Sequence, residues 1–203
     1  MGERLLAEIP RKGNLFVITG TSGSGKDAII RILQDRDLSF HKVRTALTRE
    51  PRVGEQHERE HFFISDDEFL EWRKAGKFLE WAEVYSNRYG TPRVEVEPFL
   101  ARGEDVLLRV DVQGARTVAD LISDAVVIFI APPSADEGFR RLAGRDTEEE
   151  IDIERRLAAF EEEMAFGRTG AHMVVNQTDQ QEAAADEVAA IMAAHGAARL
   201  DPA

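Results

Sequence analysis

The chain has 203 residues, of which 43% are hydrophobic and 32% charged, and this composition indicates a globular protein with a substantial core. The formal net charge of −12 argues against broad binding to nucleic acid or to an anionic membrane, so an anionic ligand would need positive charge concentrated at one place. Because the chain contains no cysteine, disulfides, thiol catalysis and thiolate zinc sites are excluded.

A glycine-rich segment follows the first predicted strand, which runs from Asn14 to Thr19. The segment consists of Gly20, Thr21, Ser22, Gly23, Ser24, Gly25, Lys26 and Asp27. A helix is predicted directly after it, from about Lys26 to Gln34. Strand, glycine-rich turn and helix are the context in which GxxxxGK binds phosphates, because backbone N–H groups and the positive end of the helix surround the anion. We therefore predict a nucleoside triphosphate site, with Lys26 at the β- and γ-phosphates.

The next segments predict a small, mostly β insertion at residues 44–91. A strand is expected from Phe40 to Thr48 and a polar loop after it. Ser65 opens a capping box, which predicts a helix that ends at Gly76. Two extended segments are expected over residues 77–89, before the chain turns at a glycine.

The second half of the chain alternates strands with helices. Two apolar runs, Asp105–Asp111 and Ala125–Ala131, predict buried strands, and Met173–Val175 predicts a last short strand. A kink or a late helix start is expected at Pro98, and three helices are expected to be capped by Ser134, Thr147 and Thr178. This alternation predicts a doubly wound α/β core with a parallel sheet.

Further motifs follow the glycine-rich segment in a fixed order. They are Leu47–Glu55 (LTREPRVGE), Phe78–Val84 (FLEWAEV), Asn87–Thr91 (NRYGT), Val110–Arg116 (VDVQGAR), Ile130–Ser134 (IAPPS), Arg141–Thr147 (RLAGRDT) and Arg155–Leu157 (RRL). Over nearly the whole chain, this order and spacing resemble the guanylate kinase family of nucleoside monophosphate kinases. The resemblance implies a three-layer α/β/α P-loop NTPase fold with a parallel core sheet. It also implies a P-loop core at 1–43, 92–134 and 158–203, a small α+β GMP-binding insertion at 44–91 and a helical lid at 135–157.

The activity that the resemblance implies is transfer of the γ-phosphoryl group of ATP to GMP or dGMP, with Mg²⁺ as cofactor. The second pKa of a phosphate monoester is about 6, so the acceptor is already a nucleophile at neutral pH and needs no protein base. The protein must instead hold two polyanions together and neutralise the charge that spreads over the migrating group. The expected partners are ATP and GMP, with no nucleic acid and no membrane, in a monomer or homodimer. No long apolar run or signal peptide is evident, so we expect a cytoplasmic location.

Residues that match the family's motifs take their roles from the resemblance. The catalytic residues would be Lys26, Arg49, Arg141, Arg145 and Arg156, and the ATP-binding residues those of the glycine-rich segment. The GMP-binding residues would be Thr45, Arg49, Arg52, His61, Glu80, Tyr89, Thr91 and Asp111. Arg49 and Arg52 would clamp the acceptor phosphate as planar forks. Glu80 would accept hydrogen bonds from the N1–H and 2-amino groups of guanine, which adenine cannot offer.

Three positions depart from the family pattern. Asp27 replaces the Mg²⁺-binding hydroxyl, His61 stands where a phosphate-binding tyrosine is usual, and Arg109 replaces an acid two residues before Asp111. A carboxylate at position 27 could ligate Mg²⁺, which takes oxygen donors. We expect Arg109 to pair with Asp27 or Asp111, which would keep the local charge near the family norm.

Two other functions stay open from the sequence. The Gly-Lys-Asp of the glycine-rich segment also looks like that of the ribose 1,5-bisphosphate phosphokinases, which have no guanine site. The motifs around Glu80 and Asp111 look instead like those of guanylate kinases. A non-catalytic guanylate-kinase-like interaction module is the third possibility, although such modules typically lose the phosphate-loop and lid residues that Lys26 and Arg141 represent here.

Overall fold

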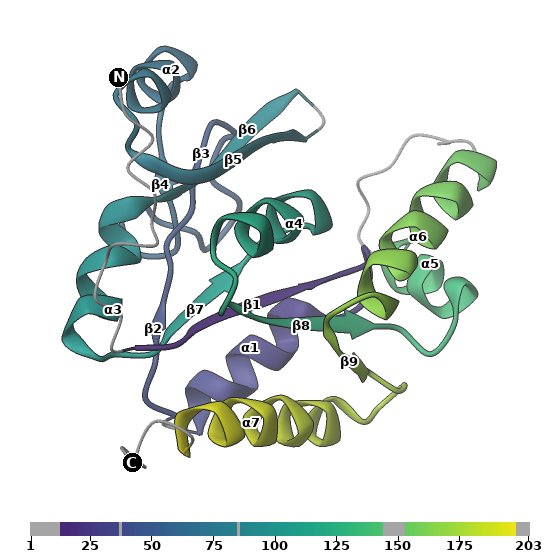
Figure 1. The fold of residues 1–203 in the computed structure, drawn as a ribbon. Helices are drawn as coiled ribbons and strands as arrows, with labels where there is room; N and C mark the ends of the chain where they lie inside the picture. Colours follow the sequence, from purple (N-terminus) through teal and green to yellow (C-terminus); the bar gives the residue numbers. More distant parts are fainter. Residues whose placement is uncertain (1–12, 37, 85, 144–152, 198–203) are drawn as a thin grey trace. The chain divides into compact units, whose positions relative to one another are not determined.

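The computed structural model describes residues 13–36, 38–84, 86–143 and 153–197 of the chain (Figure 1). The chain forms two compact units. The first unit consists of Met1–Leu15, Phe40–Leu108 and Arg116–Ala125, and the second of Phe16–Ser39, Arg109–Ala115 and Val126–Ala203. No helix among the described residues is both long and apolar enough to cross a membrane.

The core sheet has five strands in the order β2-β7-β1-β8-β9. Its strands are β1 (Leu15–Gly20), β2 (His41–Lys42), β7 (Val106–Arg109), β8 (Val126–Ala131) and β9 (His172–Val175). The strand pairs β2–β7, β1–β8 and β8–β9 are all parallel, with Val17 opposite Val127 in the pair of β1 with β8. Every residue of β1 and β8 is buried, as expected for strands of a parallel sheet that is covered on both faces.

Helices of the second unit cover β1, β8 and β9. They are α1 (Lys26–Asp35), α5 (Ala135–Ala143), α6 (Ile153–Arg168) and α7 (Gln181–Ala197); the short α4 (Val112–Leu121) contributes its first turn to this unit. In Figure 1, α1 and α7 lie side by side against one face and α6 lies on the other. Phe129 of β8 marks the α6 face, where it packs against Met164 and Phe166. Both apolar faces of these strands are therefore buried.

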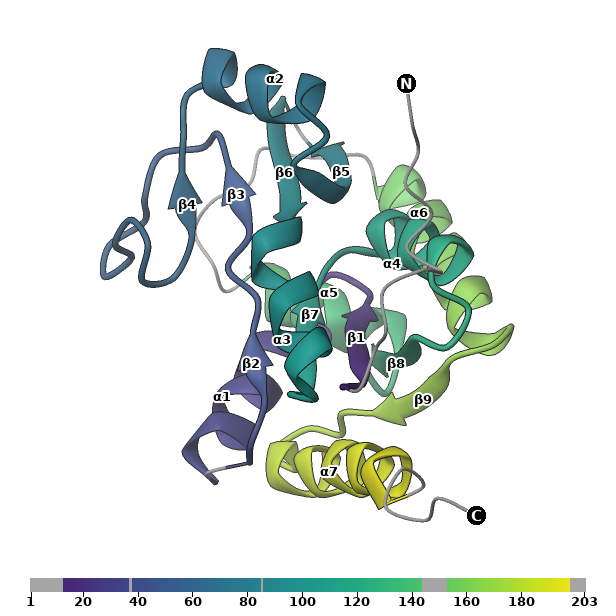
Figure 2. The ribbon, with the colours of Figure 1, turned by 60° about the vertical axis from the view of Figure 1, so that its left-hand side comes forward.

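The first unit contains a second sheet of four strands in the order β4-β3-β6-β5. These strands are β3 (Ala46–Leu47), β4 (Phe62–Phe63), β5 (Phe78–Val84) and β6 (Asn87–Pro92) (Figure 2). Helix α2 (Asp66–Lys74) packs on this sheet through Phe69, whose ring stacks on Phe78 at 4.6 Å between centroids. A 3-10 helix, η2 (Arg93–Glu95), and α3 (Glu97–Arg102) follow β6.

The predicted α/β fold with a parallel core sheet is confirmed, and so are several local signals. Ser65 caps α2 by accepting a hydrogen bond from the Glu68 N–H at 3.1 Å. Ser134 caps α5 in the same way, through the Glu137 N–H at 3.2 Å. Helix α3 starts late, with Pro98 in its first turn. The expected cap at Thr147 lies outside the described residues.

Two predicted elements were wrong, and so was the turn expected at Gly90, which lies inside β6; the chain turns between β5 and β6 instead. The single strand Phe40–Thr48 is two short strands in different sheets, β2 and β3. The break comes at Arg44, whose N–H donates to the carboxylate of Glu95 at 3.1 Å instead of to a neighbouring strand. Thr178 does not cap α7, which begins at Gln181, because its hydroxyl donates to Glu137 Oε1 at 3.0 Å instead.

Candidate active site

The glycine-rich segment joins β1 to α1 and approaches its neighbours closely at two glycines. Gly20 has φ +144°, and a Cβ there would lie 1.9 Å from the carbonyl oxygen of Ile130. Gly25, with φ +87°, is the N-cap of α1, and a Cβ there would lie 2.3 Å from Nδ2 of Asn176. The first N–H groups of α1 have no partner within the helix, so this end of α1 can bind an anion.

The ammonium group of Lys26 lies on the segment itself. Its Nζ donates to the carbonyl oxygens of Gly20 at 2.7 Å and Thr21 at 2.8 Å, and more weakly to Ser24 Oγ at 3.4 Å. Burial lowers the pKa of Lys26 to about 8, and the positive charge of Arg109 adds to this shift. The ammonium is therefore cationic at neutral pH but loses its proton more readily than an exposed lysine does.

The expected pairing of Arg109 is confirmed, with Asp27 as its partner. Arg109 Nη2 donates to Asp27 Oδ2 at 3.1 Å, and Arg109 Nε lies 3.1 Å from Asp27 Oδ1. Both carboxylate oxygens therefore face one guanidinium. The two side chains are 54% and 42% exposed, so the pair lies at the surface of the second unit, in the first turn of α1.

Asp27 also bears on the expected Mg²⁺ site. Within the described ranges, no group of three or more His, Asp or Glu side chains could hold a metal ion. Mg²⁺ usually keeps several waters and takes one or two carboxylates together with substrate phosphate oxygens. One carboxylate in the first turn after Lys26 fits that chemistry, so the residues fit an ion held mainly by phosphates, with Asp27 as the protein's contribution.

Two further residues contact the glycine-rich segment, and the sequence analysis missed both. Glu163 of α6 accepts a hydrogen bond from the Ser22 N–H, and burial raises the pKa of its carboxyl against the opposing charge of Lys26. Asn176, directly after β9, donates from Nδ2 to the carbonyl oxygen of Ser24 at 2.8 Å. The segment is thus held from α6 on one side and from the end of β9 on the other.

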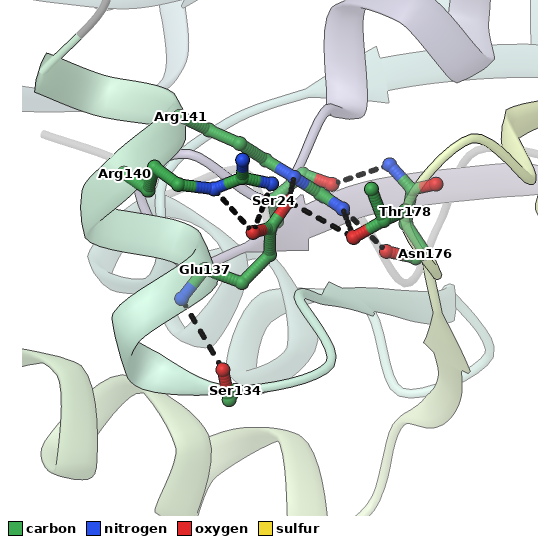
Figure 3. Close-up of polar contacts among 7 residues, drawn as sticks. All are labelled: Ser24, Ser134, Glu137, Arg140, Arg141, Asn176 and Thr178. Atoms are coloured by element: carbon green, nitrogen blue, oxygen red, sulfur yellow. Dashed lines mark hydrogen bonds and ion pairs between the residues drawn. The ribbon is translucent and has the colours of Figure 1, made fainter.

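Arg141, expected in the lid, lies at the C-terminal part of α5 (Figure 3). Its Nε donates to Glu137 Oε1 at 2.8 Å, and its Nη2 donates to the carbonyl oxygen of Asn176 at 3.2 Å. Of the two other lid arginines, Arg145 lies outside the described residues, and Arg156 lies in α6 with its side chain undescribed. The described part of the lid therefore places one predicted arginine beside Asn176.

In the first unit, the predicted phosphate clamp surrounds Glu55. Arg49 donates from Nη1 and Nη2 to Glu55 Oε2 and Oε1 at 2.7 and 2.9 Å, and the Arg52 N–H donates to Oε2 at 2.9 Å. The hydrogen bonds from Arg49 lower the pKa of Glu55 to about 2. Tyr89 is hydrogen-bonded to Arg49, and the charge of His61 acts on Glu55. Of the two predicted clamp arginines, Arg49 therefore binds Glu55 through its guanidinium and Arg52 through its backbone N–H alone.

The predicted guanine-binding residues Glu80 and Thr91 lie on two adjacent strands of the four-stranded sheet. Glu80 of β5 is 6% exposed, and Thr91 of β6 is completely buried. The Thr91 hydroxyl donates to Glu80 Oε1 at 2.5 Å, so the two predicted side chains are in direct contact. Thr45 lies between β2 and β3, where its carbonyl oxygen accepts from the Phe62 N–H at 3.0 Å.

Asp111 belongs to the second unit and has a structural partner. Its Oδ1 accepts a hydrogen bond from the Gly114 N–H at 2.7 Å, which caps the start of α4. Its negative charge also acts on Lys26 and on Glu163. The predicted carboxylate thus lies close enough to the glycine-rich segment to influence it while it holds a helix end.

Sequence signals for the missed residues exist but are weak. Glu55 follows Arg49 by six positions across a turn with a left-handed Gly54, so a contact between the two was foreseeable. Asn176 directly follows β9, at the end of a parallel sheet where ligands bind. Glu163 is one of three consecutive glutamates in α6, and nothing in the sequence separates it from its neighbours.

Comparison with known proteins covers nearly the whole chain. The family model described as Guanylate kinase matches residues 12–195. A guanylate kinase of Rubrobacter xylanophilus is 44% identical over 182 residues, which cover 90% of this chain and 94% of that protein. A guanylate kinase of Dechloromonas aromatica is 42% identical over 184 residues, covering 91% and 90%. The crystal structure of guanylate kinase from Anaplasma phagocytophilum gives a TM-score of 0.74 at 29% identity and covers 92% of this chain and 87% of that one.

Proposed function

This chain belongs to the guanylate kinase family, and we propose that it transfers the γ-phosphoryl group of ATP to GMP or dGMP, giving ADP and GDP. The observation that carries the choice of acceptor is the buried carboxylate of Glu80, hydrogen-bonded by Thr91. A carboxylate only accepts hydrogen bonds, so a carboxylate at a binding site selects a base that presents N–H donors to it. Guanine supplies two such donors, N1–H and the 2-amino group, and adenine supplies neither.

The donor side of the reaction rests on the second unit. The N–H groups at the start of α1 bind the triphosphate, and Lys26 moves from the carbonyl oxygens of Gly20 and Thr21 to the β- and γ-phosphates. Arg141, Arg145 and Arg156 supply positive charge from the lid at residues 135–157. Stabilising the charge that develops on the migrating group is the main catalytic task in such reactions.

The acceptor side rests on the first unit, in the insertion at residues 44–91. Arg49 presents both Nη atoms to one oxyanion, which is the geometry that a phosphate monoester requires. The GMP phosphate replaces Glu55 on Arg49 and recruits Arg52, Tyr89 and His61. Since the phosphate is itself the nucleophile, these residues orient it and remove no proton.

When it is bound, Mg²⁺ neutralises charge on the donor phosphates. Asp27 would hold the ion directly or through a water molecule bound to it. Arg109 keeps the carboxylate of Asp27 from adding an unpaired negative charge beside the triphosphate. The expected cytoplasmic location is part of the same proposal, because ATP and GMP are metabolites of that compartment.

The two alternatives are not favoured. A ribose 1,5-bisphosphate phosphokinase has no guanine site, whereas this chain buries Glu80 against Thr91. An interaction module without activity would not need Lys26, whose ammonium is held on the loop by two carbonyl oxygens.

The test is one coupled assay with ATP and Mg²⁺, in which GMP, dGMP, AMP and ribose 1,5-bisphosphate are offered separately. Turnover of GMP and dGMP with none of AMP is the expected result. Turnover of the sugar bisphosphate alone would transfer the assignment to the phosphokinase. GMP binding without any turnover would support the interaction module.

A further inference from the structure

Asn176 connects the end of the core sheet to the glycine-rich segment. It directly follows β9 and is 1% exposed. Its N–H donates to the carbonyl oxygen of Ala131 at 2.8 Å, which continues the pairing of β9 with β8. Its side-chain Nδ2 donates to the carbonyl oxygen of Ser24 at 2.8 Å, across 152 positions of sequence. A buried amide thus reaches from the sheet into the turn that precedes α1.

The contact extends to the next residue of the segment. A Cβ at Gly25 would lie 2.3 Å from Nδ2 of Asn176, which is closer than non-bonded atoms approach. Gly25 is therefore required for its left-handed φ of +87° and also because the amide of Asn176 packs against its Cα. The Ser24 carbonyl is buried with its residue, so it needs a donor such as this one.

The consequence follows from the planarity of the peptide bond. In a trans peptide, the C=O of Ser24 and the N–H of Gly25 point in opposite directions. Holding the carbonyl oxygen towards Asn176 turns the Gly25 N–H to the opposite side, away from the sheet end. That N–H is one of the donors at the start of α1 that an anion can use.

A second layer of contacts fixes the backbone of Asn176 (Figure 3). Its carbonyl oxygen accepts from Arg141 Nη2 at 3.2 Å. The Arg141 guanidinium is in turn held by Glu137, which also accepts from the hydroxyl of Thr178 at 3.0 Å. Arg141 and Glu137 of α5, together with Thr178, therefore stabilise the backbone position from which the Asn176 amide reaches Ser24.

We propose that Asn176 is a positioning residue for the donor triphosphate: its side-chain amide fixes the Ser24–Gly25 peptide so that the Gly25 N–H faces the phosphates. The inference rests on the proposed function only in taking ATP as the ligand of this segment. Asn176 itself touches the loop and not the reacting atoms.

The test compares Asn176→Ala and Asn176→Asp with the parent protein and with the matched control Gln177→Ala, which changes the next residue of the same turn. Asn176→Ala removes one buried hydrogen bond, so the Kd and the KM for ATP should rise about tenfold. The KM for GMP should change less than twofold. Asn176→Asp should lose more, because a carboxylate repels both the Ser24 carbonyl and the phosphates.

Hydrogen exchange gives a readout that does not depend on turnover. In Asn176→Ala, the peptide that covers residues 20–27 should exchange faster, and bound ATP should protect it less than in the parent. The control variant should match the parent in both measurements. Asn176→Ser, which keeps a small polar group, is the substitute if the alanine variant does not fold.

Failure of the inference differs from failure of the proposed function. If Asn176→Ala melts at a lower temperature but keeps the parent's ATP affinity and hydrogen exchange, then Asn176 has a structural role only. A parent protein that binds ATP but does not phosphorylate GMP would overturn the function and leave the ATP affinity comparison valid. A parent protein that does not bind ATP would overturn both.

Discussion

The ion pair between Asp27 and Arg109 offers a sharp test of the donor site, because it is a departure from the family pattern. Asp27→Ser restores the hydroxyl usual for the family, and Arg109→Asp restores the acid. Asp27→Ser alone leaves Arg109 without its partner, and Arg109→Asp alone leaves Asp27 facing a second carboxylate beside Lys26. Arg109 lowers the pKa of Lys26 and Asp27 raises it, so the single variants perturb the same ammonium in opposite directions.

The magnitude can be worked from the geometry. The two contacts, both at 3.1 Å, align one guanidinium with one carboxylate, but the side chains are 42% and 54% exposed. Exposed pairs of this kind contribute about 0.2–1 kcal/mol, and good alignment favours the upper end. A coupling of about 1 kcal/mol corresponds to roughly a fivefold difference in kcat/KM for ATP. The double variant should therefore be about five times more active than the product of the single effects predicts.

The assay is a double-mutant cycle in kcat/KM for ATP at saturating GMP and Mg²⁺. The pair of Arg102 and Glu104 is the control, because its contact of 2.6 Å has similar exposure, at 53% and 47%, and involves no predicted site residue. Its alanine cycle should alter stability slightly and activity not at all. Additive effects of Asp27→Ser and Arg109→Asp, within about 0.3 kcal/mol, would refute the idea that the two departures compensate each other.

Three more predictions follow from single sites. Because the pKa of Lys26 is about 8, kcat/KM for ATP should fall about tenfold per pH unit above that value, and a profile that stays flat to high pH would contradict this. Glu80→Gln should lower kcat/KM for GMP about 100-fold with little change in the KM for ATP, because it replaces one of the two acceptor oxygens by an amide donor that faces a guanine donor; a loss below threefold would exclude that role. Glu95→Gln should lower the free energy of unfolding by about 3 kcal/mol, because it leaves Arg44 without its buried partner, and thermal melts will measure this. Burial raises the pKa of Glu95, but the hydrogen bonds and charge of Arg44 lower it by more, so the net shift is downward. The stability from this carboxylate is therefore present above the ordinary glutamate pKa and is lost on acidification. A parent Tm that does not fall in acid would count against this.

Features encoded by neighbouring residues could be predicted from the sequence. The helix caps at Ser65 and Ser134 depend on a contact three residues away, and both are present. Strands β1 and β8 could be predicted from continuous apolar runs, because a strand of a parallel sheet is buried on both faces. An ion pair of Arg109 with Asp27 or Asp111 was predicted, because Asp27 and Arg109 both depart from the family pattern, and the structure shows Asp27 as the partner.

Features that depend on distant partners could not be predicted in this way. The break between β2 and β3 occurs because Glu95, far along the chain, takes the N–H of Arg44. Thr178 looks like a helix cap, but its hydroxyl bonds to Glu137. Propensity describes what a residue prefers locally, and a hydrogen bond to a distant carboxylate outweighs a local preference of a few tenths of a kcal/mol to about 1 kcal/mol.

The hydrogen bond from Asn176 to Ser24 also has a consequence for biosynthesis. The two residues are 152 positions apart, so at roughly 5–20 residues per second the ribosome adds the amide about 8–30 s after the segment that it orients. The emerging chain carries its glycine-rich turn for most of that time without the residue that turns the Gly25 N–H. Full affinity for ATP is therefore acquired late in synthesis, when the strand that precedes Asn176 joins the sheet.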